Sequence, residues 1–258
     1  MILYHASSSY YSMIARLALL SAKVPFTSRR MDIHLAKEQL SDWYLKINPH
    51  MTVPSLVDDT QTLTDSRDIL KYAASLAGEQ WMDSDSAVTQ NIENIVAGQY
   101  GIPIEKLTFG KALLSIPPLR LIVPKMLRGI IQKLEAELAS SPDPLALTKK
   151  ININRERLAY FTEGKLADKL EIERAHIRNF LNSLPASSTQ AMLFGAQTSS
   201  ADVVTAVLLG RLRMIGEYGL IAQDSPLDQW FTRMQTTSAF KQSDIWMRFQ
   251  PWRIVLKR

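Results

Sequence analysis

Two short segments carry residues that together could bind a small peptide. Val53-Pro54 opens an extended stretch, where a proline suits a tight turn, expected to be cis, that leaves the Val53 backbone free to pair with an extended guest. Asp65-Ser66 precedes apolar residues at helical spacing, so it predicts a helix start whose free N–H groups and positive dipole end would hold a carboxylate. The two segments predict a site for a small anionic peptide.

The motifs around these segments resemble one known family. Asn48-Pro49, Val53–Leu56 and Asp65-Ser66 are similar to the glutathione-binding half of the soluble glutathione S-transferases, and the similarity continues in the family's order over residues 1–78. The segment Gly101–Gly110 is also similar to an insertion shared by two branches of that family. These branches are the tetrachlorohydroquinone reductive dehalogenases and the ganglioside-induced differentiation-associated proteins. The resemblance implies glutathione as co-substrate.

The resemblance also implies how glutathione would be held. Asp65 and Ser66 would hold its γ-glutamyl end, and Gln39 would contact its glycine carboxylate. Its cysteinyl backbone would dock on the turn formed by Thr52, Val53 and Pro54.

The reacting thiol must come from the substrate, because the chain contains no cysteine. A thiol such as that of glutathione has a pKa of about 8.5, and a hydrogen-bond donor beside the sulfur would favour the reactive thiolate. The loop after the first predicted strand offers such donors, because residues 7–12 are all serine or tyrosine. Alignment of this loop on the serine-using classes of the family places Ser9 at the activating position, with Tyr11 as the second candidate.

A purely structural role is the alternative for the same loop. Serines before a helix usually cap it, so Ser9 could act only as an N-cap. Tyr10 and Tyr11 could only pack the first helical turn. Tyr11 also lies where the dehalogenase branch carries a cysteine, and a phenol cannot form the mixed disulfide that cysteine chemistry requires. Reductive dehalogenation by that route is therefore not expected.

Composition limits the partners of the chain. It has 258 residues and a net charge of +5 from 30 Lys and Arg against 25 Asp and Glu, with the cations dispersed among acids, so no nucleic acid partner is expected. The four histidines lie in separate segments without ligand spacing, so no metal site is expected. The first residues enter a strand pattern at once, and no apolar run is long enough to span a bilayer. We therefore expect a cytoplasmic protein without membrane association.

The elements that must position the candidate residues follow a β-α-β-α-β-β-α order. Strands are expected at 2–6, 27–33, 55–57 and 62–63, and helices at 10–23, 37–46 and 65–77. After Gly78 the strand patterns stop, and Ser199 and Asp202 fit a capping box at the start of one later helix. We predict an α/β thioredoxin-like N-terminal domain, residues 1–78, followed by an all-α C-terminal bundle, residues 85–258, as in the glutathione S-transferases.

An insertion is expected at about residues 102–150 of the helical domain. Repeated prolines, among them Pro117, Pro118 and Pro124, predict short helices and turns there. Residues 119–133 mix aliphatic side chains with four cations and could lie on an anionic membrane or cover an apolar pocket. A helix that buries its apolar face on the bundle is favoured, because Pro124 and Gly129 interrupt any long amphipathic face.

These motifs lead to one functional expectation and one alternative. The expectation is a glutathione transferase, in which the thiolate of bound glutathione attacks a small apolar electrophile. The alternative is a glutathione-binding interaction protein of the same fold with little or no turnover, because fold does not fix activity. The resemblance also implies a homodimer.

Overall fold

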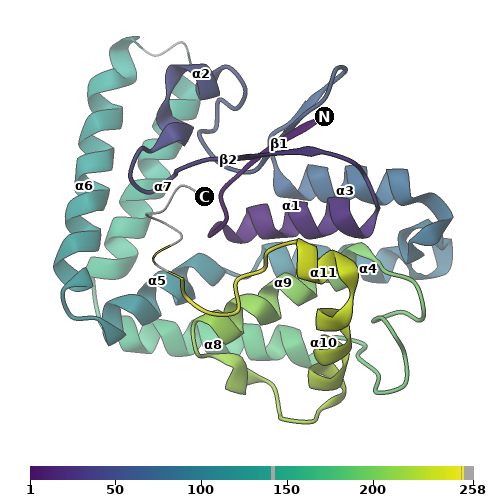
Figure 1. The fold of residues 1–258 in the computed structure, drawn as a ribbon. Coiled ribbons are helices and arrows are strands. Elements are labelled where there is room, and N and C mark those ends of the chain that lie inside the picture. The colour runs from purple at the N-terminus through teal and green to yellow at the C-terminus, as the bar shows by residue number, and fades with distance from the viewer. Residues whose placement is uncertain (141–142, 251, 253–258) are drawn as a thin grey trace. The chain divides into compact units, whose positions relative to one another are not determined.

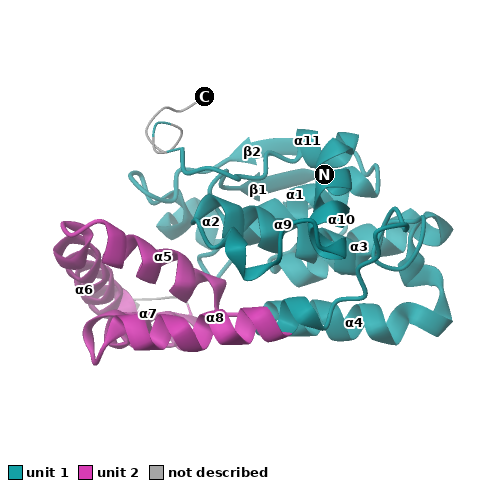
Figure 2. Ribbon diagram, turned by 90° about the horizontal axis from the view of Figure 1, so that it is seen from below, with its two compact units in different colours: residues 1–101, 180–258 teal, residues 102–179 magenta. Residues whose placement is uncertain are grey.

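The computed structural model describes residues 1–140, 143–250 and 252. Figure 2 shows two compact units, with residues 1–101 and 180–258 in teal and residues 102–179 in magenta. The predicted division into residues 1–78 and 85–258 follows the change from strand patterns to helical patterns in the sequence, and it stays a prediction.

A four-stranded mixed sheet forms one layer of the first unit. Its strands are β1 (Ile2–His5), β2 (Thr27–Arg30), β3 (Ser55–Val57) and β4 (Thr62–Leu63), in the order β2-β1-β3-β4. β1 runs parallel to β2 and antiparallel to β3, with Tyr4 opposite Arg29 on one side and Ser55 on the other. The loop that follows β1 therefore starts from the middle of the sheet.

Helices α1 (Tyr10–Ser21) and α3 (Ser66–Ala77) lie side by side in this unit (Figure 1). Two short helices, η1 (Glu38–Leu40) and α2 (Asp42–Leu45), lie in the connection between β2 and β3. The resulting βαβαββα order, with only helices after it in the described residues, confirms the predicted fold class.

The rest of the first unit is helical. Its elements are η2 (Gly78–Gln80), η3 (Met82–Ser84), α4 (Ser86–Tyr100), α9 (Ser200–Met214), η5 (Tyr218–Leu220), α10 (Pro226–Thr236) and α11 (Ser238–Gln242). Helix α9 packs against α1 and α4, and α11 packs against α1. Residues 200–212 of α9 are all buried, which is typical of a helix inside a core.

The start of α9 is the capping box predicted from the sequence. Ser199 accepts a hydrogen bond from the N–H of Asp202, whose carboxylate accepts from the N–H groups of Ser199 and Leu193, each at 2.8 Å. Ser200 adds a link to η3, because its N–H donates to Asp83 at 2.8 Å. Burial raises the pKa of Asp202 to about 6, although these donors oppose the rise.

The second unit consists of helices in its described residues. They are α5 (Ile104–Ser115), α6 (Leu119–Glu137), η4 (Leu138–Ser140), α7 (Pro144–Thr162) and α8 (Leu166–Asn182), of which residues 180–182 belong to the first unit. Helices α6 and α7 lie side by side (Figure 1). Among all described helices, none combines the length and the apolar character that crossing a membrane requires.

The expectation of short helices and turns over residues 102–150 is wrong, because α6 and α7 have 19 residues each. The position of the prolines explains the difference. Pro103 and Pro118 are N-cap residues and Pro144 is the first residue of α7, where no helical hydrogen bond needs the missing N–H. Pro124 lies inside α6 and removes one helical hydrogen bond, yet it is buried and the helix continues through it.

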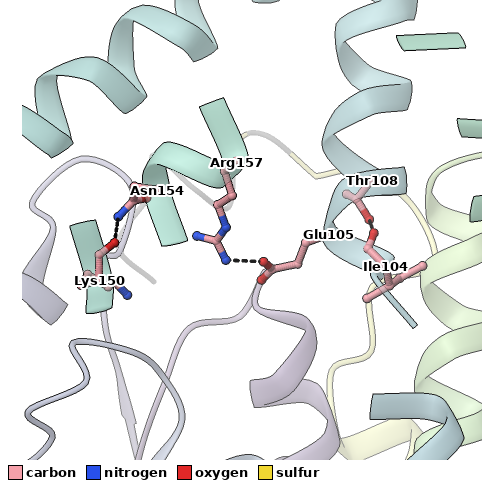
Figure 3. A network of polar contacts seen from close by, with 6 residues as sticks. All are labelled: Ile104, Glu105, Thr108, Lys150, Asn154 and Arg157. Atoms are coloured by element: carbon pink, nitrogen blue, oxygen red, sulfur yellow. Dashed lines mark hydrogen bonds and ion pairs between the residues drawn. The ribbon is translucent and has the colours of Figure 1, made fainter. Parts of the chain in front are cut away.

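A polar network joins α5 to α7 within the second unit, as Figure 3 shows. Arg157 donates to the Glu105 carboxylate at 2.5 Å, and the buried Asn154 side chain donates to the Lys150 carbonyl at 2.9 Å. Burial, together with the nearby Arg157, lowers the pKa of the Lys150 ammonium to about 8. Because the Arg157–Glu105 pair is partly open to solvent, it aligns the two helices more than it stabilises them.

Replacing Asp202 with alanine is expected to lower the free energy of unfolding by about 2–4 kcal/mol, because two buried N–H groups lose their acceptor. Urea denaturation measures this change. The control is Asp85→Ala, which removes the exposed N-cap of α4 and should cost only about 1 kcal/mol. Equal losses in the two variants would contradict the importance of the buried capping box.

The raised pKa of Asp202 predicts a pH dependence of stability. Its folded-state pKa, about 6, lies above the ordinary value of 3.8, so the folded protein holds this proton more tightly than the unfolded chain does. The resulting stabilisation is complete below about pH 4 and is lost as the pH rises through about 6. As the pH rises from about 4 to about 6, the free energy of unfolding of the wild type should fall relative to that of the Asp202→Asn variant, whose side chain cannot ionise. A constant difference between the two proteins would refute this assignment.

Candidate functional site

Two buried arginines hold the loop between β1 and α1. Arg16 donates to the carbonyl of Ala6 at 3.2 Å and to that of Ser7 at 3.3 Å, and Arg211 of α9 donates to the carbonyl of Ser8 at 2.9 Å. Three consecutive carbonyls thus point toward buried cations. This arrangement fixes the backbone that leads into the first turn of α1.

The imidazole of His5 is a neutral acceptor for the Arg16 side chain, which holds this loop. Its Nδ1 lies 2.9 Å from Nη1 of Arg16, and because arginine can only donate, Nδ1 accepts and the ring proton is on Nε2. Nε2 then donates to the Ser28 hydroxyl at 2.6 Å. Burial, reinforced by Arg16, lowers the pKa of His5 to about 3. His5 therefore supports Arg16 and stays uncharged at neutral pH.

Ser9, the first candidate for thiol activation, is the N-cap residue of α1. Its hydroxyl accepts the N–H of Ser12 at 3.3 Å, so the capping role considered as an alternative is present. Ser9 is half-buried, and the proton of its hydroxyl has no acceptor within the described residues. Capping uses the oxygen as an acceptor and leaves the O–H group able to donate to a bound anion.

The two tyrosines after Ser9 differ in their surroundings. Tyr10 is buried, and its hydroxyl accepts from Nε2 of Gln99 at 2.5 Å. Burial raises the pKa of Tyr10 well above its ordinary value, so this phenol stays protonated. Tyr11 is half-buried, and its ring is stacked on that of Tyr100 at a centroid distance of 6.0 Å. Tyr10 thus has a packing role, whereas Tyr11 lies nearer the solvent-accessible side of the loop.

The turn before β3 has the predicted cis bond between Val53 and Pro54. Its position is fixed by hydrogen bonds to the Thr52 carbonyl, which accepts from the Tyr44 hydroxyl at 2.7 Å and from the Asn48 side chain at 2.9 Å. Tyr44 and Asn48 are both fully buried. The backbone N–H and C=O of Val53, by contrast, make no hydrogen bond within the described part of the chain. The turn is therefore held by side chains while an adjacent backbone donor and acceptor remain available.

The helix start predicted at Asp65-Ser66 is the start of α3. Asp65 is the exposed N-cap, and its carboxylate accepts from the N–H of Arg67 at 2.7 Å. Ser66 is buried, and its hydroxyl is hydrogen-bonded to that of Tyr100 at 2.8 Å. Burial raises the pKa of the Tyr100 phenol, so Tyr100 stays neutral. Through its ring and its hydroxyl, Tyr100 of α4 joins the α3 N-terminus to Tyr11.

Gln39 makes no hydrogen bond to the other candidate residues in the described part of the chain. It lies on η1, and its side-chain NH₂ donates to the Ile33 carbonyl at 3.3 Å. Its Oε1 is buried and has no partner within the described residues. The loop around Gln39 is linked to the β1–α1 loop by a 2.8 Å hydrogen bond between Ser8 and His34. The described residues contain no cluster of side chains that could hold a metal ion.

The sequence did not indicate the roles of Arg211 and Tyr100. Arg211 holds the β1–α1 loop, and Tyr100 links Tyr11 to the start of α3. Arg211 lies 203 positions from Ser8, and Tyr100 lies 34 positions from Ser66. Each is an ordinary member of a helical pattern, so no local signal could have marked it. The buried Asn48 had a signal in the Asn48-Pro49 motif, although its hydrogen bond to Thr52 was not predicted.

Known proteins are similar to both parts of this architecture. Residues 3–81 match the family model described as the glutathione S-transferase N-terminal domain. The chain is 24% identical over 259 residues to a tetrachloro-p-hydroquinone reductive dehalogenase from Sphingobium chlorophenolicum, and the match covers 93% of each protein. This similarity agrees with the dehalogenase branch noted from the Gly101–Gly110 segment.

Two solved structures illustrate how far the fold extends. The beta-etherase LigF from Sphingobium sp. strain SYK-6 has a TM-score of 0.68 and 19% identity, over 94% of this chain and 97% of that one. A glutathione transferase family member from Pseudomonas fluorescens pf-5, solved with two glutathione bound, has a TM-score of 0.64 and 13% identity, over 95% of this chain and 92% of that one. Residues 3–81 are therefore similar to the glutathione S-transferase N-terminal domain, and the chain has the glutathione S-transferase fold over nearly its full length.

Proposed function

We propose that the chain is a glutathione transferase, in which the thiolate of bound glutathione attacks a small apolar electrophile. The observation that carries this proposal is the backbone of Val53, which has no hydrogen-bond partner among the residues that the structure describes. It lies in a turn whose Thr52 carbonyl is held by Tyr44 and Asn48. An extended tripeptide can pair with such a backbone through main-chain hydrogen bonds, as an added strand does at a sheet edge.

Glutathione would be bound along residues of the first unit. Val53, with Thr52 and Pro54 beside it, would pair with the cysteinyl backbone. The N–H groups at the start of α3 and the Ser66 hydroxyl would contact the γ-glutamyl carboxylate, because a helix N-terminus favours an anion. The exposed Asp65 carboxylate would pair with the γ-glutamyl ammonium, and Gln39 would contact the glycine carboxylate.

Ser9 would then donate its hydroxyl proton in a hydrogen bond to the glutathione sulfur. A thiol pKa of about 8.5 leaves only a small fraction ionised at neutral pH, and each unit of lowering requires about 1.4 kcal/mol of preferential thiolate stabilisation. One hydrogen bond from a hydroxyl to an anion, aided by the N-terminus of α1, is of this size. The O–H group of Ser9, which has no internal acceptor in the described residues, suits this role.

The absence of cysteine limits the reaction that follows. One similar protein is named a reductive dehalogenase and another a beta-etherase. A route that forms a mixed disulfide with an enzyme thiol is not open to this chain. In the proposed reaction a bond forms between the glutathione sulfur and an electrophilic carbon, and a halide or an oxyanion leaves with the bonding electrons. A homodimer, implied by the resemblance, and a location in the cytoplasm are part of this proposal.

The central test separates binding from turnover. Ser9→Ala should keep glutathione affinity within about threefold, measured by calorimetry, while kcat/KM with an activated aryl chloride or a β-aryl ether falls about tenfold or more. The pH profile of kcat/KM should shift upward toward the pKa of free thiol, about 8.5, because the thiolate loses its donor. Ser7→Ala is the matched control, since it removes a neighbouring hydroxyl and keeps the carbonyl that Arg16 holds.

Two outcomes of this test would redirect the proposal. Full activity in Ser9→Ala together with loss in Tyr11→Phe would assign thiol activation to Tyr11. Tight glutathione binding by the wild type without turnover of any electrophile would instead support an interaction protein that kept the fold and the peptide site.

The γ-glutamyl contact predicts a selective change in affinity. Asp65→Asn keeps a side-chain acceptor for the N–H of Arg67, because asparagine also caps helices, but it removes the negative charge. Glutathione affinity should fall about tenfold, whereas affinity for cysteinylglycine, which lacks the γ-glutamyl group, should not change. Asp85→Asn, the same change at the N-cap of α4, serves as the control. Equal losses for both peptides would exclude the proposed contact.

A further inference from the structure

The net positive charge of the chain lies in one stretch of the second unit. Residues 106–134 contain six Lys or Arg and no Asp or Glu, whereas the rest of the chain has 24 cations and 25 acids. The expectation that cations are dispersed among acids is therefore wrong for this stretch. Its cations are Lys106, Lys111, Arg120, Lys125, Arg128 and Lys133.

Helix α6, which begins at Leu119 within this stretch and ends just beyond it, exposes large aliphatic side chains. Leu121 is 80% exposed, Ile122 is 55% exposed and Met126 is 44% exposed. Lys125 and Arg128 are also exposed, and they follow Leu121 by four and seven residues, which places them on its side of the helix. These five residues are called the α6 outer face.

The opposite face of α6 already packs within its own unit. Its buried residues are Pro124, Leu127, Ile131 and Leu134, at spacings of three and four residues. The prediction that α6 buries an apolar face is confirmed, but Pro124 and Gly129 do not interrupt the helix. A Cβ added at Gly129 would meet no atom within 4 Å, so the side away from the buried residues is open. The α6 outer face is thus a second apolar surface that the core does not use.

We propose that the α6 outer face docks on an anionic lipid surface. Leu121, Ile122 and Met126 would enter the boundary between headgroups and acyl chains, while Lys125 and Arg128 would contact the phosphates. The expectation of no membrane association rested on the lack of a spanning segment and on a helix over residues 119–133 that buries its apolar face. A helix lying flat on a bilayer needs no spanning segment, and α6 exposes a second apolar surface besides its buried face. This proposal is independent of the glutathione site in the first unit.

The chemistry of the face favours lipid over other partners. Two copies of this face would bring like charges together, which opposes self-association through it. Single-stranded nucleic acid is bound largely by stacking on aromatic rings, whereas the exposed apolar residues of the α6 outer face are aliphatic. Aliphatic side chains flanked by cations, in a stretch without acids, match the apolar and anionic layers of a bilayer surface.

The test is sedimentation of the full chain with phosphatidylcholine vesicles that contain or lack phosphatidylserine. The wild type should partition at least about tenfold more strongly to the anionic vesicles, and this preference should fall as salt is added. The double variants Leu121→Ser/Ile122→Ser and Lys125→Glu/Arg128→Glu should each weaken this binding about tenfold or more, because one loses apolar contact and the other loses charge attraction.

Two matched controls keep the result specific to α6. Leu145→Ser changes an equally exposed leucine on α7, which is 81% exposed, and Lys149→Glu/Lys165→Glu changes net charge by the same amount at other exposed sites of the unit. Both controls should bind like the wild type, and circular dichroism should show unchanged helix content in every variant. Failure of the wild type to bind anionic vesicles would overturn the proposal, and so would equal losses in the control and α6 variants. Dimerisation lost on Leu121→Ser/Ile122→Ser, without lipid binding, would assign the face to a second copy.

Discussion

The loop that carries Ser9 depends on the buried guanidinium of Arg16. Besides the carbonyls of that loop, Arg16 donates to the carbonyl of Ser243 at 2.7 Å and to that of Asp244 at 3.0 Å. An arginine can do this because its five N–H donors form a fixed planar fork, which a lysine ammonium does not provide. A buried cation is costly when its acceptors are lost, so the end of α11 and the β1–α1 loop must keep their positions together. The geometry at Ser9 therefore depends on the C-terminal part of the first unit as well as on the sheet.

In the proposed site, recognition would rely on backbone groups more than on side chains. Val53 offers its N–H and C=O, and the start of α3 offers the free N–H groups of a helix N-terminus. The side chains of Tyr44 and Asn48 act indirectly, because they fix the turn that carries Val53. A site built in this way can persist while most surface residues change. This agrees with a fold shared over nearly the whole chain at 19% identity.

Features set by neighbouring residues were predictable from the sequence, and features set by distant contacts were not. The cis turn at Pro54, the helix start at Ser66 and the box at Ser199 each follow from residues within a few positions. The contact between Arg211 and Ser8 depends on how α9 packs against α1, which no local pattern contains. Residues 102–150 form longer helices than expected because Pro103, Pro118 and Pro144 lie at helix starts, where proline is tolerated.

The acid-free stretch at residues 106–134 accounts for the basic isoelectric point of the chain. The isoelectric point of about 9.3 suggests a uniformly basic molecule, yet the residues outside 106–134 are almost neutral in sum. A cation-exchange resin would therefore hold the protein mainly through this one segment. Elution from such a column, compared between variants, would report the exposure of the cations on α5 and α6 instead of an average over the whole surface.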